Sequence, residues 1–249
     1  MLSKQLIEGD ARFLQQEYAQ TFLNSFIDKS LTPKCIFIHI PKCAGSTIRN
    51  NFHLVSSWEY HATAATFIEA FNQTNPNQGL DIFLSHHPFT VVRNPFDRVV
   101  SWFFYHRASV WVHGRYEPSD PSYNVKTTDP KLAFESWVLD RCPTHWATTD
   151  TIESSYHVFK TDPRPVAVWR QLNWLEYKDE VVVPDFNIIR YEKLEDTIPQ
   201  LKDSGNDRRL KKSDRDSDYR NYYTNSKLID IVTELCADDL DYFGYQFGD

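Results

Sequence analysis

"CIFIHIPKCAGSTIRNNF", residues 35–52, indicates how the chain folds around its first candidate site. The apolar run Cys35–Ile40 predicts a buried strand, and Pro41 ends it. Ser46 is a residue type that caps helices, and helix-compatible residues follow it. The stretch therefore predicts a strand, a tight turn and a helix, which is the geometry of a phosphate-binding loop.

The turn between this strand and this helix carries the residues of an anion site. Ala44 and Gly45 are small and let an anion approach the backbone. Lys42 adds a cation, and the hydroxyls of Ser46 and Thr47 add donors at a helix N-terminus, where the dipole favours negative charge. The order differs from the G-x-x-x-x-G-K-[ST] of an ATP-binding P-loop. An ordinary strand-to-helix turn is the alternative.

A second junction of this kind lies in "VVRNPFDRVVSWFFYHR", residues 91–107. Asn94 suits the N-cap of a helix, Pro95 suits its first position, and Asp97 stands where a capping-box acid belongs. Apolar residues at helical spacing predict the buried face of this helix, Phe96, Val99, Val100, Phe103 and Phe104.

Arg93 and Ser101 form the second candidate anion site. Arg93 ends the predicted strand Phe89–Val92, and Ser101 lies two turns into the helix, so both side chains could close on one phosphate. The alternative is an ion pair between Arg93 and a nearby acid such as Asp97. A ligand with two separate anionic groups would use both sites. A contiguous triphosphate normally requires Mg²⁺ held by an acid at a strand end, and Asp81 precedes its predicted strand.

The rest of the pattern predicts an α/β fold. Strands alternate with helices along residues 1–249, which indicates a single domain with a central, mostly parallel sheet flanked by helices. Residues 1–30 are expected to add an amphipathic helical extension that docks on this domain or on a second subunit. The expected elements are strands at Leu80–Leu84, Val181–Val183 and Phe186–Ile189, a helix at Phe13–Ile27, a loop at Trp111–Asp129, and a last helix with Leu228, Val232, Leu235 and Leu240 on its apolar side.

Composition excludes several classes of protein. The formal net charge is −7, so we expect no nucleic-acid partner. No apolar run approaches the ~20 residues that span a bilayer, and the charged N-terminus lacks the apolar core of a signal peptide. Four scattered cysteines without a C-x-x-C pair favour reduced thiols over a disulfide framework or a zinc site, so we expect no metal.

The motifs "FIHIPKCAGSTI" and "VVRNPFDRVVSWF" resemble the two cofactor motifs of sulfotransferases that use 3′-phosphoadenosine 5′-phosphosulfate. The branch that contains the Golgi heparan 2-O- and chondroitin enzymes is similar also in "FLSHHPF", "IIRYEKLED" and "YYTNSKLIDIVTELCADDLDYFGYQF", so the resemblance spans residues 35–247. It implies a single α/β domain and catalysis without a metal. It also implies that Arg93 and Ser101 hold the 3′-phosphate, and that the 5′-phosphosulfate lies on Lys42, Cys43, Ala44, Gly45, Ser46 and Thr47.

Sulfuryl transfer needs a base for the acceptor hydroxyl and a cation for the leaving oxygen. Lys42 is the expected cation. His86 is the preferred base and His87 the next. Neighbouring side chains on an extended segment point opposite ways, so only one of the two histidines can face the acceptor. The alternative for both is a strand-end histidine satisfied by backbone carbonyls. The base would then lie elsewhere, at His39, Glu59 or His61.

Three further expectations concern partners and location. The acceptor is expected to be a glycan or a small hydroxylated metabolite. The alternatives to this function are a nucleotide kinase or other P-loop phosphotransferase, and a non-catalytic nucleotide-binding module. A cytoplasmic protein of bacterial or viral source is expected, with the Golgi lumen the alternative if the sequence is truncated. A homodimer is one of the two oligomeric states left open. The charged run Asp207–Arg220 is either a solvated loop or a flap that brings Arg208, Arg209 or Arg220 to the 3′-phosphate.

Overall fold

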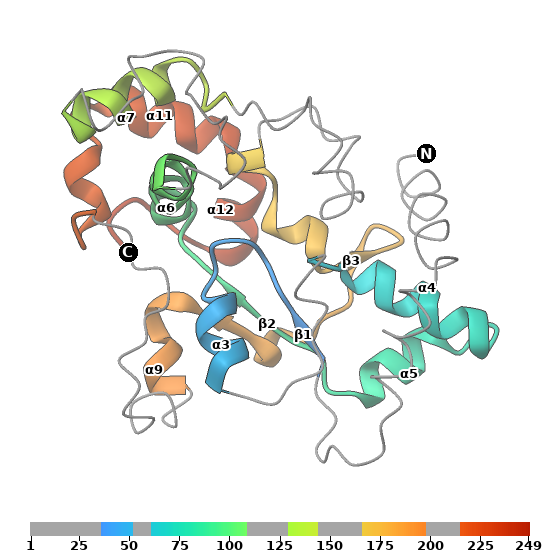
Figure 1. Ribbon diagram of the computed structural model, residues 1–249. Coiled ribbons are helices and arrows are strands. Elements are labelled where there is room, and N and C mark those ends of the chain that lie inside the picture. The colour runs from blue at the N-terminus through green and yellow to red at the C-terminus, as the bar shows by residue number, and fades with distance from the viewer. Residues whose placement is uncertain (1–35, 52–60, 109–128, 144–165, 198–214) are drawn as a thin grey trace, which may run out of the picture. The chain divides into compact units, whose positions relative to one another are not determined.

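A computed structural model of the chain describes five stretches, residues 36–51, 61–108, 129–143, 166–197 and 215–249 (Figure 1). The expected helix Phe13–Ile27, the extension over residues 1–30 and all of the loop Trp111–Asp129 except Asp129 lie outside these residues. Those expectations stay predictions.

The chain divides into two compact units. Of the described residues, the first unit holds 36–51, 61–92 and 171–197. The second unit holds 93–108, 129–143, 166–170 and 215–249. The expectation of a single domain over residues 1–249 stays a prediction.

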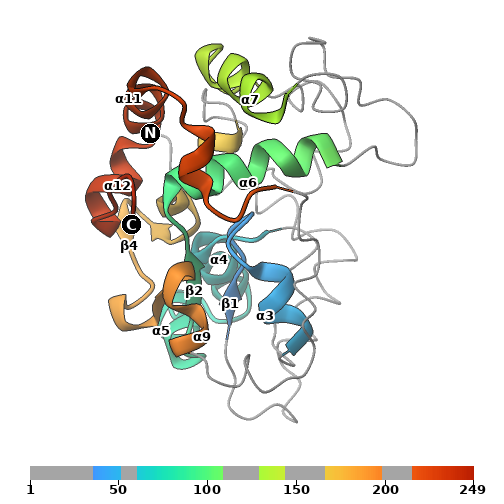
Figure 2. The same ribbon diagram turned by 90° about the vertical axis from the view of Figure 1, so that its left-hand side faces the viewer.

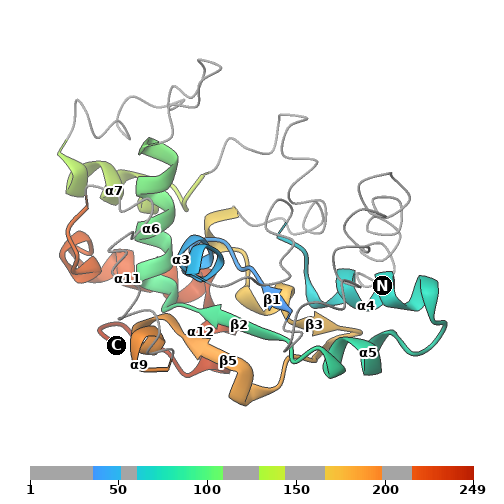
Figure 3. The ribbon, with the colours of Figure 1, turned by 60° about the horizontal axis from the view of Figure 1, so that its bottom comes forward.

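A parallel sheet of three strands lies in the first unit. Its order is β1 (Phe37–Ile38), β2 (Phe89–Val92) and β5 (Ile188–Arg190), and each neighbouring pair is parallel (Figure 3). The expected α/β fold with a parallel sheet flanked by helices is confirmed. Because the strands are parallel, their carboxyl ends share one edge of the sheet, where α/β proteins place their ligand sites.

The first strand is short and entirely buried. Ile36, Phe37 and Ile38 are at most 1% exposed, as in a parallel strand that is covered on both faces. The strand is thus confirmed with narrower bounds than the predicted Cys35–Ile40. The following helix, α3, spans Gly45–Asn51, so Ser46 lies inside its first turn and the prediction of Ser46 as the cap was wrong.

Two helices pack together before β2. They are α4 (Ala64–Thr74) and α5 (Gly79–Ser85), which lie side by side in Figure 1. The predicted strand Leu80–Leu84 is therefore wrong. A short apolar run fits a buried strand or a helix equally well. Tertiary contact decides here, because Asn72 Oδ1 accepts the N–H of Gly79 at 2.8 Å and a Cβ at Gly79 would overlap the backbone of α4.

The chain before β5 forms an antiparallel hairpin. β3 (Glu176–Tyr177) pairs with β4 (Glu180–Val181) across Lys178 and Asp179, whose φ angles are 53° and 67°. Positive φ at both central residues is the conformation of a type I′ turn, which matches the twist of the two strands. The strand predicted at Val181–Val183 therefore starts at Glu180 and ends at Val181.

The last strand of the sheet is displaced from its expected position. The predicted strand Phe186–Ile189 begins instead with a 3₁₀ helix, η6 (Asp185–Asn187), and β5 follows it. The other short elements are η4 (Val166–Val168), η5 (Gln171–Trp174), η7 (Tyr191–Lys193), α9 (Leu194–Thr197) and η8 (Tyr219–Tyr222).

The second unit is helical and begins with α6 (Pro95–Ala108). Asn94 Oδ1 accepts the N–H of Phe96 at 3.0 Å, so the predicted cap and the first helical position are confirmed. The predicted buried face is confirmed as well, because Phe96, Val99, Val100, Phe103 and Phe104 are at most 6% exposed. Phe103 packs on the aromatic rings of α7 (Pro130–Leu139).

Two helices replace the single last helix that the sequence predicts. α11 spans Ser226–Leu235 and Cys236 is its C-cap. α12 (Ala237–Phe243) follows it at an angle (Figure 2). Leu228, Val232 and Leu235 are buried as expected. Among the described residues, none of the helices is both long and apolar enough to cross a membrane.

Candidate functional site

The loop after β1 has the backbone conformation of an anion-binding nest. φ is 67° at Lys42 and 60° at Ala44, and it is negative at Cys43 and Gly45. Such alternation turns successive N–H groups toward one side, where they can hold an anion. Positive φ costs a residue with a Cβ about 1–2 kcal/mol, so the surrounding structure must hold Lys42 and Ala44 in this conformation.

Gly45 is required by a close approach of the first histidine. A Cβ at Gly45 would overlap the imidazole ring of His39, with Nε2 as its nearest atom. His39 follows β1 and is 8% exposed, so its ring has little room to move aside. The loop is therefore backed by a buried imidazole, and no larger residue fits at position 45.

Cys43 faces inward and closes the loop. Its thiol is fully buried and donates to Gln171 Oε1 at 3.3 Å, while its backbone N–H donates to Ile40 O at 3.3 Å. The side chain of Cys43 thus belongs to the packing behind the loop. Gln171 lies 128 residues further along the chain, and no sequence pattern pointed to it. Four other residues of the predicted loop site are at least partly open to solvent, namely Lys42, Ala44, Ser46 and Thr47.

A second histidine lies beside His39. The ring centroids of His39 and His61 are 4.1 Å apart, and His61 Nδ1 lies 2.8 Å from the backbone oxygen of His39. A carbonyl only accepts, so His61 Nδ1 carries the proton, and in the neutral ring Nε2 is the proton acceptor. Trp174 Nε1 donates to His61 O at 3.0 Å and fixes the backbone of this histidine.

His86 and His87 lie at the opposite edge of the sheet from this loop. The backbone oxygen of His86 accepts the N–H of Ile36 at 3.0 Å, and Ile36 stands just before β1. Both histidines also precede β2, so they stand at the amino ends of the strands. The structure does not bring them together with Lys42. The expectation that a side chain at 86 or 87 reaches the same crevice is corrected by the parallel pairing of β1 and β2.

The ring of His86 has structural partners of its own. Its Nδ1 donates to Ile82 O at 2.7 Å, and the ring stacks on Phe71 with centroids 5.4 Å apart. This is the environment of a histidine satisfied by a backbone carbonyl at the end of a helix. His87 is exposed and has a φ of 46°.

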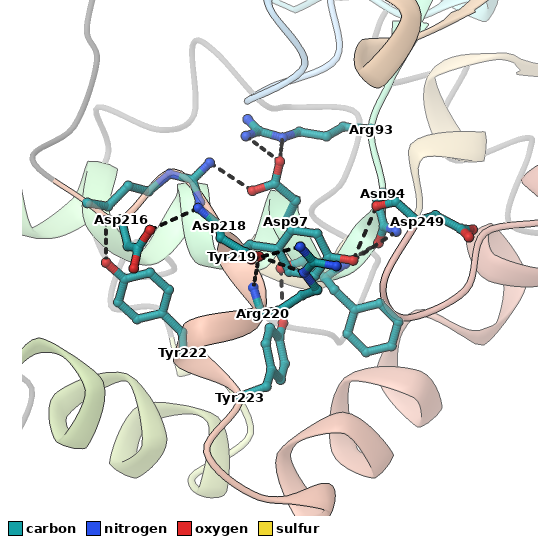
Figure 4. A network of polar contacts seen from close by, with 12 residues as sticks. Arg93, Asn94, Asp97, Asp216, Asp218, Tyr219, Arg220, Tyr222, Tyr223 and Asp249 are labelled. Atoms are coloured by element: carbon teal, nitrogen blue, oxygen red, sulfur yellow. Dashed lines mark hydrogen bonds and ion pairs between the residues drawn. The ribbon is translucent and has the colours of Figure 1, made fainter.

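Arg93 forms a buried ion pair at the start of α6. Its Nη2 lies 2.6 Å and its Nε 2.8 Å from Asp97 Oδ2, and Figure 4 shows its guanidinium directed at that carboxylate. Arg215 Nη2 reaches the other oxygen, Asp97 Oδ1, at 2.7 Å. Ser101 is buried one turn beyond Asp97. The ion pair that the sequence offered as the alternative is thus present, together with a second arginine that the sequence did not single out.

The described part of the charged run Asp207–Arg220 begins at Arg215. Arg220 is exposed, and its Nε and Nη2 bind Asp218 at 2.8 Å (Figure 4). Arg208 and Arg209 lie outside the described residues. Within the described stretches, no group of three or more His, Cys, Asp or Glu side chains could hold a metal ion.

Comparison with known families gives a match over almost the whole chain. The family described as the sulfotransferase family matches residues 26–246. The chain belongs to the sulfotransferase family. This family includes Golgi carbohydrate sulfotransferases, among them heparan sulfate 2-O- and chondroitin enzymes. No curated protein and no solved structure matches the chain.

Membership supports sulfuryl transfer as the activity and a hydroxylated acceptor as the partner of this sulfotransferase. It also agrees with the strand, loop and helix that the structure forms around Lys42 and Gly45.

Proposed function

We propose that this sulfotransferase transfers the sulfuryl group of 3′-phosphoadenosine 5′-phosphosulfate to a hydroxyl of a glycan or a small metabolite. The observation that carries the proposal is the loop after β1, in which two residues with a Cβ adopt positive φ and Gly45 lies against His39. Residues held in sparsely populated backbone conformations cluster at active sites and ligand-binding loops. A homodimer and a cytoplasmic location stay predictions.

The loop suits the 5′-phosphosulfate. Backbone N–H groups of the loop other than that of Cys43, which donates to Ile40 O, and the hydroxyls of Ser46 and Thr47 are the donors proposed for its oxygens. Lys42 is the residue proposed to stabilise the bridging oxygen as it gains charge during transfer. Gly45 allows the backbone to approach the anion, and Ala44 adds little bulk.

Arg93 and Ser101 are proposed to bind the 3′-phosphate. Arg93 follows β2 directly, at the carboxyl end of the strand next to β1, and Ser101 lies on the helix that follows. A guanidinium forms charge-assisted hydrogen bonds with phosphate oxygens. A nucleotide phosphorylated at both the 3′ and the 5′ position would therefore use both candidate anion sites.

For the base, we propose His61 in place of His86 and His87. The support is its contact with His39, the histidine against Gly45, and the proton on Nδ1 that leaves Nε2 as the acceptor. His61 is also more exposed than His39. An imidazole titrates near ~6.5 and accepts a proton at neutral pH.

The alternative functions differ in their nucleotide. A kinase would bind ATP with Mg²⁺, and the loop lacks the Gly-Lys-Ser order of such enzymes. A non-catalytic module would bind the nucleotide without turnover.

Calorimetry with 3′-phosphoadenosine 5′-phosphate, 5′-AMP and ATP plus Mg²⁺ tests the proposal. We expect the bisphosphate to bind roughly ten- to a hundredfold more tightly than 5′-AMP, because a charge-assisted contact contributes ~1.5–3 kcal/mol. Equal affinities for these two nucleotides would contradict the proposed donor. Transfer of labelled sulfate from the donor to a glycan or alcohol then separates an enzyme from a binding module.

A further inference from the structure

Two arginines share one buried carboxylate in the second unit. Asp97 Oδ2 binds Arg93 at 2.6 Å, and Asp97 Oδ1 binds Arg215 at 2.7 Å, so each carboxylate oxygen takes one guanidinium. The side chains of Arg93, Asp97 and Arg215 are 6%, 12% and 12% exposed. The three groups together carry one net positive charge.

The geometry of α6 makes Asp97 the centre of this cluster. Asp97 and Ser101 lie four residues apart in α6, the spacing that places side chains on one face of a helix, and Arg93, two residues before α6, binds Asp97. Asp97 thus lies between the two residues proposed for the 3′-phosphate. Arg215 comes from a segment 118 residues later and closes on the same face.

Arg215 has hydrogen-bonding capacity beyond this pair. Its Nη2 is used by Asp97, whereas its Nη1 is buried and has no hydrogen-bond partner among the described residues. A buried guanidinium nitrogen without an acceptor is costly, and a carboxylate shared between two arginines neutralises only one of them. An additional anion at this position would supply both the missing acceptor and the missing charge.

We propose that Arg215 is a second guanidinium for the 3′-phosphate and that Asp97 is the positioning residue that holds Arg93 and Arg215 as a pair. The inference rests on the proposed function. Asp97 fixes the planes of both guanidiniums before the nucleotide arrives, so little side-chain entropy is lost on binding. The phosphate then accepts from Arg215 Nη1, which has no hydrogen-bond partner among the described residues.

The test measures two dissociation constants, one for 5′-AMP and one for the bisphosphate, in the full chain and in its variants. The first divided by the second is the ratio that reports the contribution of the 3′-phosphate. Arg215→Gln should reduce this ratio by up to about tenfold and leave part of it, since it removes one arginine from the 3′-phosphate while Arg93 and Ser101 remain. Arg220→Gln is the matched control, because Arg220 is exposed and bound to Asp218. The ratio measured for Arg220→Gln should equal that of the unaltered protein. In turnover, Arg215→Gln should raise KM for the donor and leave kcat unchanged, as for uniform binding.

Asp97→Asn separates positioning from simple charge pairing. If Asp97 positions the arginines, the amide loses one of its two acceptors and the ratio falls, while Asp97→Glu restores part of it. If Asp97 is only a counter-ion that competes with phosphate, its neutralisation frees both arginines and the ratio rises, which would overturn the positioning role. Thermal unfolding without nucleotide checks that each variant folds. If Asp97→Asn does not fold, the result for Arg215→Gln decides the test.

The failure of this inference differs from the failure of the proposed function. If the unaltered protein does not prefer the bisphosphate over 5′-AMP, the proposed donor is wrong. If the unaltered protein has this preference and Arg215→Gln keeps it in full, only the role of Arg215 is wrong.

Discussion

The two edges of the parallel sheet differ in how their backbone and histidines are held. At the carboxyl end of β1, Lys42 and Ala44 adopt positive φ, and Gly45 lies against a buried imidazole. At the amino ends of β1 and β2, His86 lies at the end of a helix, and its Nδ1 donates to a carbonyl of that helix. Its backbone oxygen accepts a hydrogen bond from Ile36, at the start of the sheet. Both edges hold a residue with a Cβ at positive φ, His87 at the amino edge included, but only the first combines two such residues with a glycine packed against a buried imidazole.

This difference shows that closeness in sequence to Arg93 does not place a histidine at the same edge of the sheet as Lys42. His86 and His87 stand a few residues before Arg93, but β2 lies between them and carries the chain from one edge of the sheet to the other. His61 is separated from the loop by residues 48–60, yet its ring meets His39 beside Gly45. Strand direction, rather than distance along the chain, decides which histidine shares an edge with Lys42.

The largest expected effect compares a histidine from each edge. His61→Asn should lower kcat by about 10²–10⁴, the effect of losing a general base, with nucleotide binding nearly intact. Asn is chosen because it tolerates the φ of 46° at this position. His86→Asn is the matched control and should change kcat only a few-fold. Steady-state kinetics with the donor and a fixed acceptor measure both variants.

The reverse outcome would break the comparison. If His86→Asn abolishes turnover and His61→Asn does not, then the amino edge carries the base as the sequence first predicted. The acceptor pocket would then have to be placed there.

An intermediate effect is expected from the loop itself. Gly45→Ala places a Cβ on the His39 ring, and such overpacking costs ~1–3 kcal/mol, which is roughly 5- to 150-fold in nucleotide affinity if the loop must shift. Ala44→Gly is the control and should retain affinity, because glycine adopts the φ of 60° without strain. Calorimetry with the bisphosphate compares the two. Equal affinity in Gly45→Ala and the unaltered protein would show that the loop does not hold the nucleotide.

The smallest expected effect lies at the amino edge. His87→Gly removes a Cβ at a φ of 46°, but glycine also has more freedom in the unfolded chain. The free energy of unfolding should therefore rise by only about 0–1 kcal/mol, and turnover should stay unchanged. Denaturant unfolding and the transfer assay measure the two quantities. Loss of turnover in this variant would give the amino edge a role in catalysis.

Local features of the fold could be predicted where the deciding contact lies within a few residues. The Asn94 cap and Pro95 at the start of α6 were predicted because a cap is satisfied by the backbone of the next turn. β2 was predicted at its observed bounds, since an apolar β-branched run before a helix start has few other conformations. The segment Leu80–Leu84 was mistaken for a strand, because its helix depends on the contact of Gly79 with Asn72 in α4.

The candidate site divides in the same way. The loop residues Lys42–Thr47 were proposed as a candidate site from sequence alone, because a strand–loop–helix turn is a local backbone feature. The distant partners of the two candidate anion sites were not predicted, because they come from segments far along the chain. Gln171 meets Cys43 across 128 residues, and Arg215 meets Asp97 across 118.

The sequence by itself determined the strand–loop–helix unit, the start of α6 and the membership of the sulfotransferase family. Each of these depends on residue types at fixed local spacing. Only the tertiary structure decided that His61 lies with His39 beside the loop, that His86 and His87 lie at the other edge, and that Asp97 is shared by two arginines. The physical reason is that strand pairing and helix packing join residues whose separation in the chain carries no information about their distance in space.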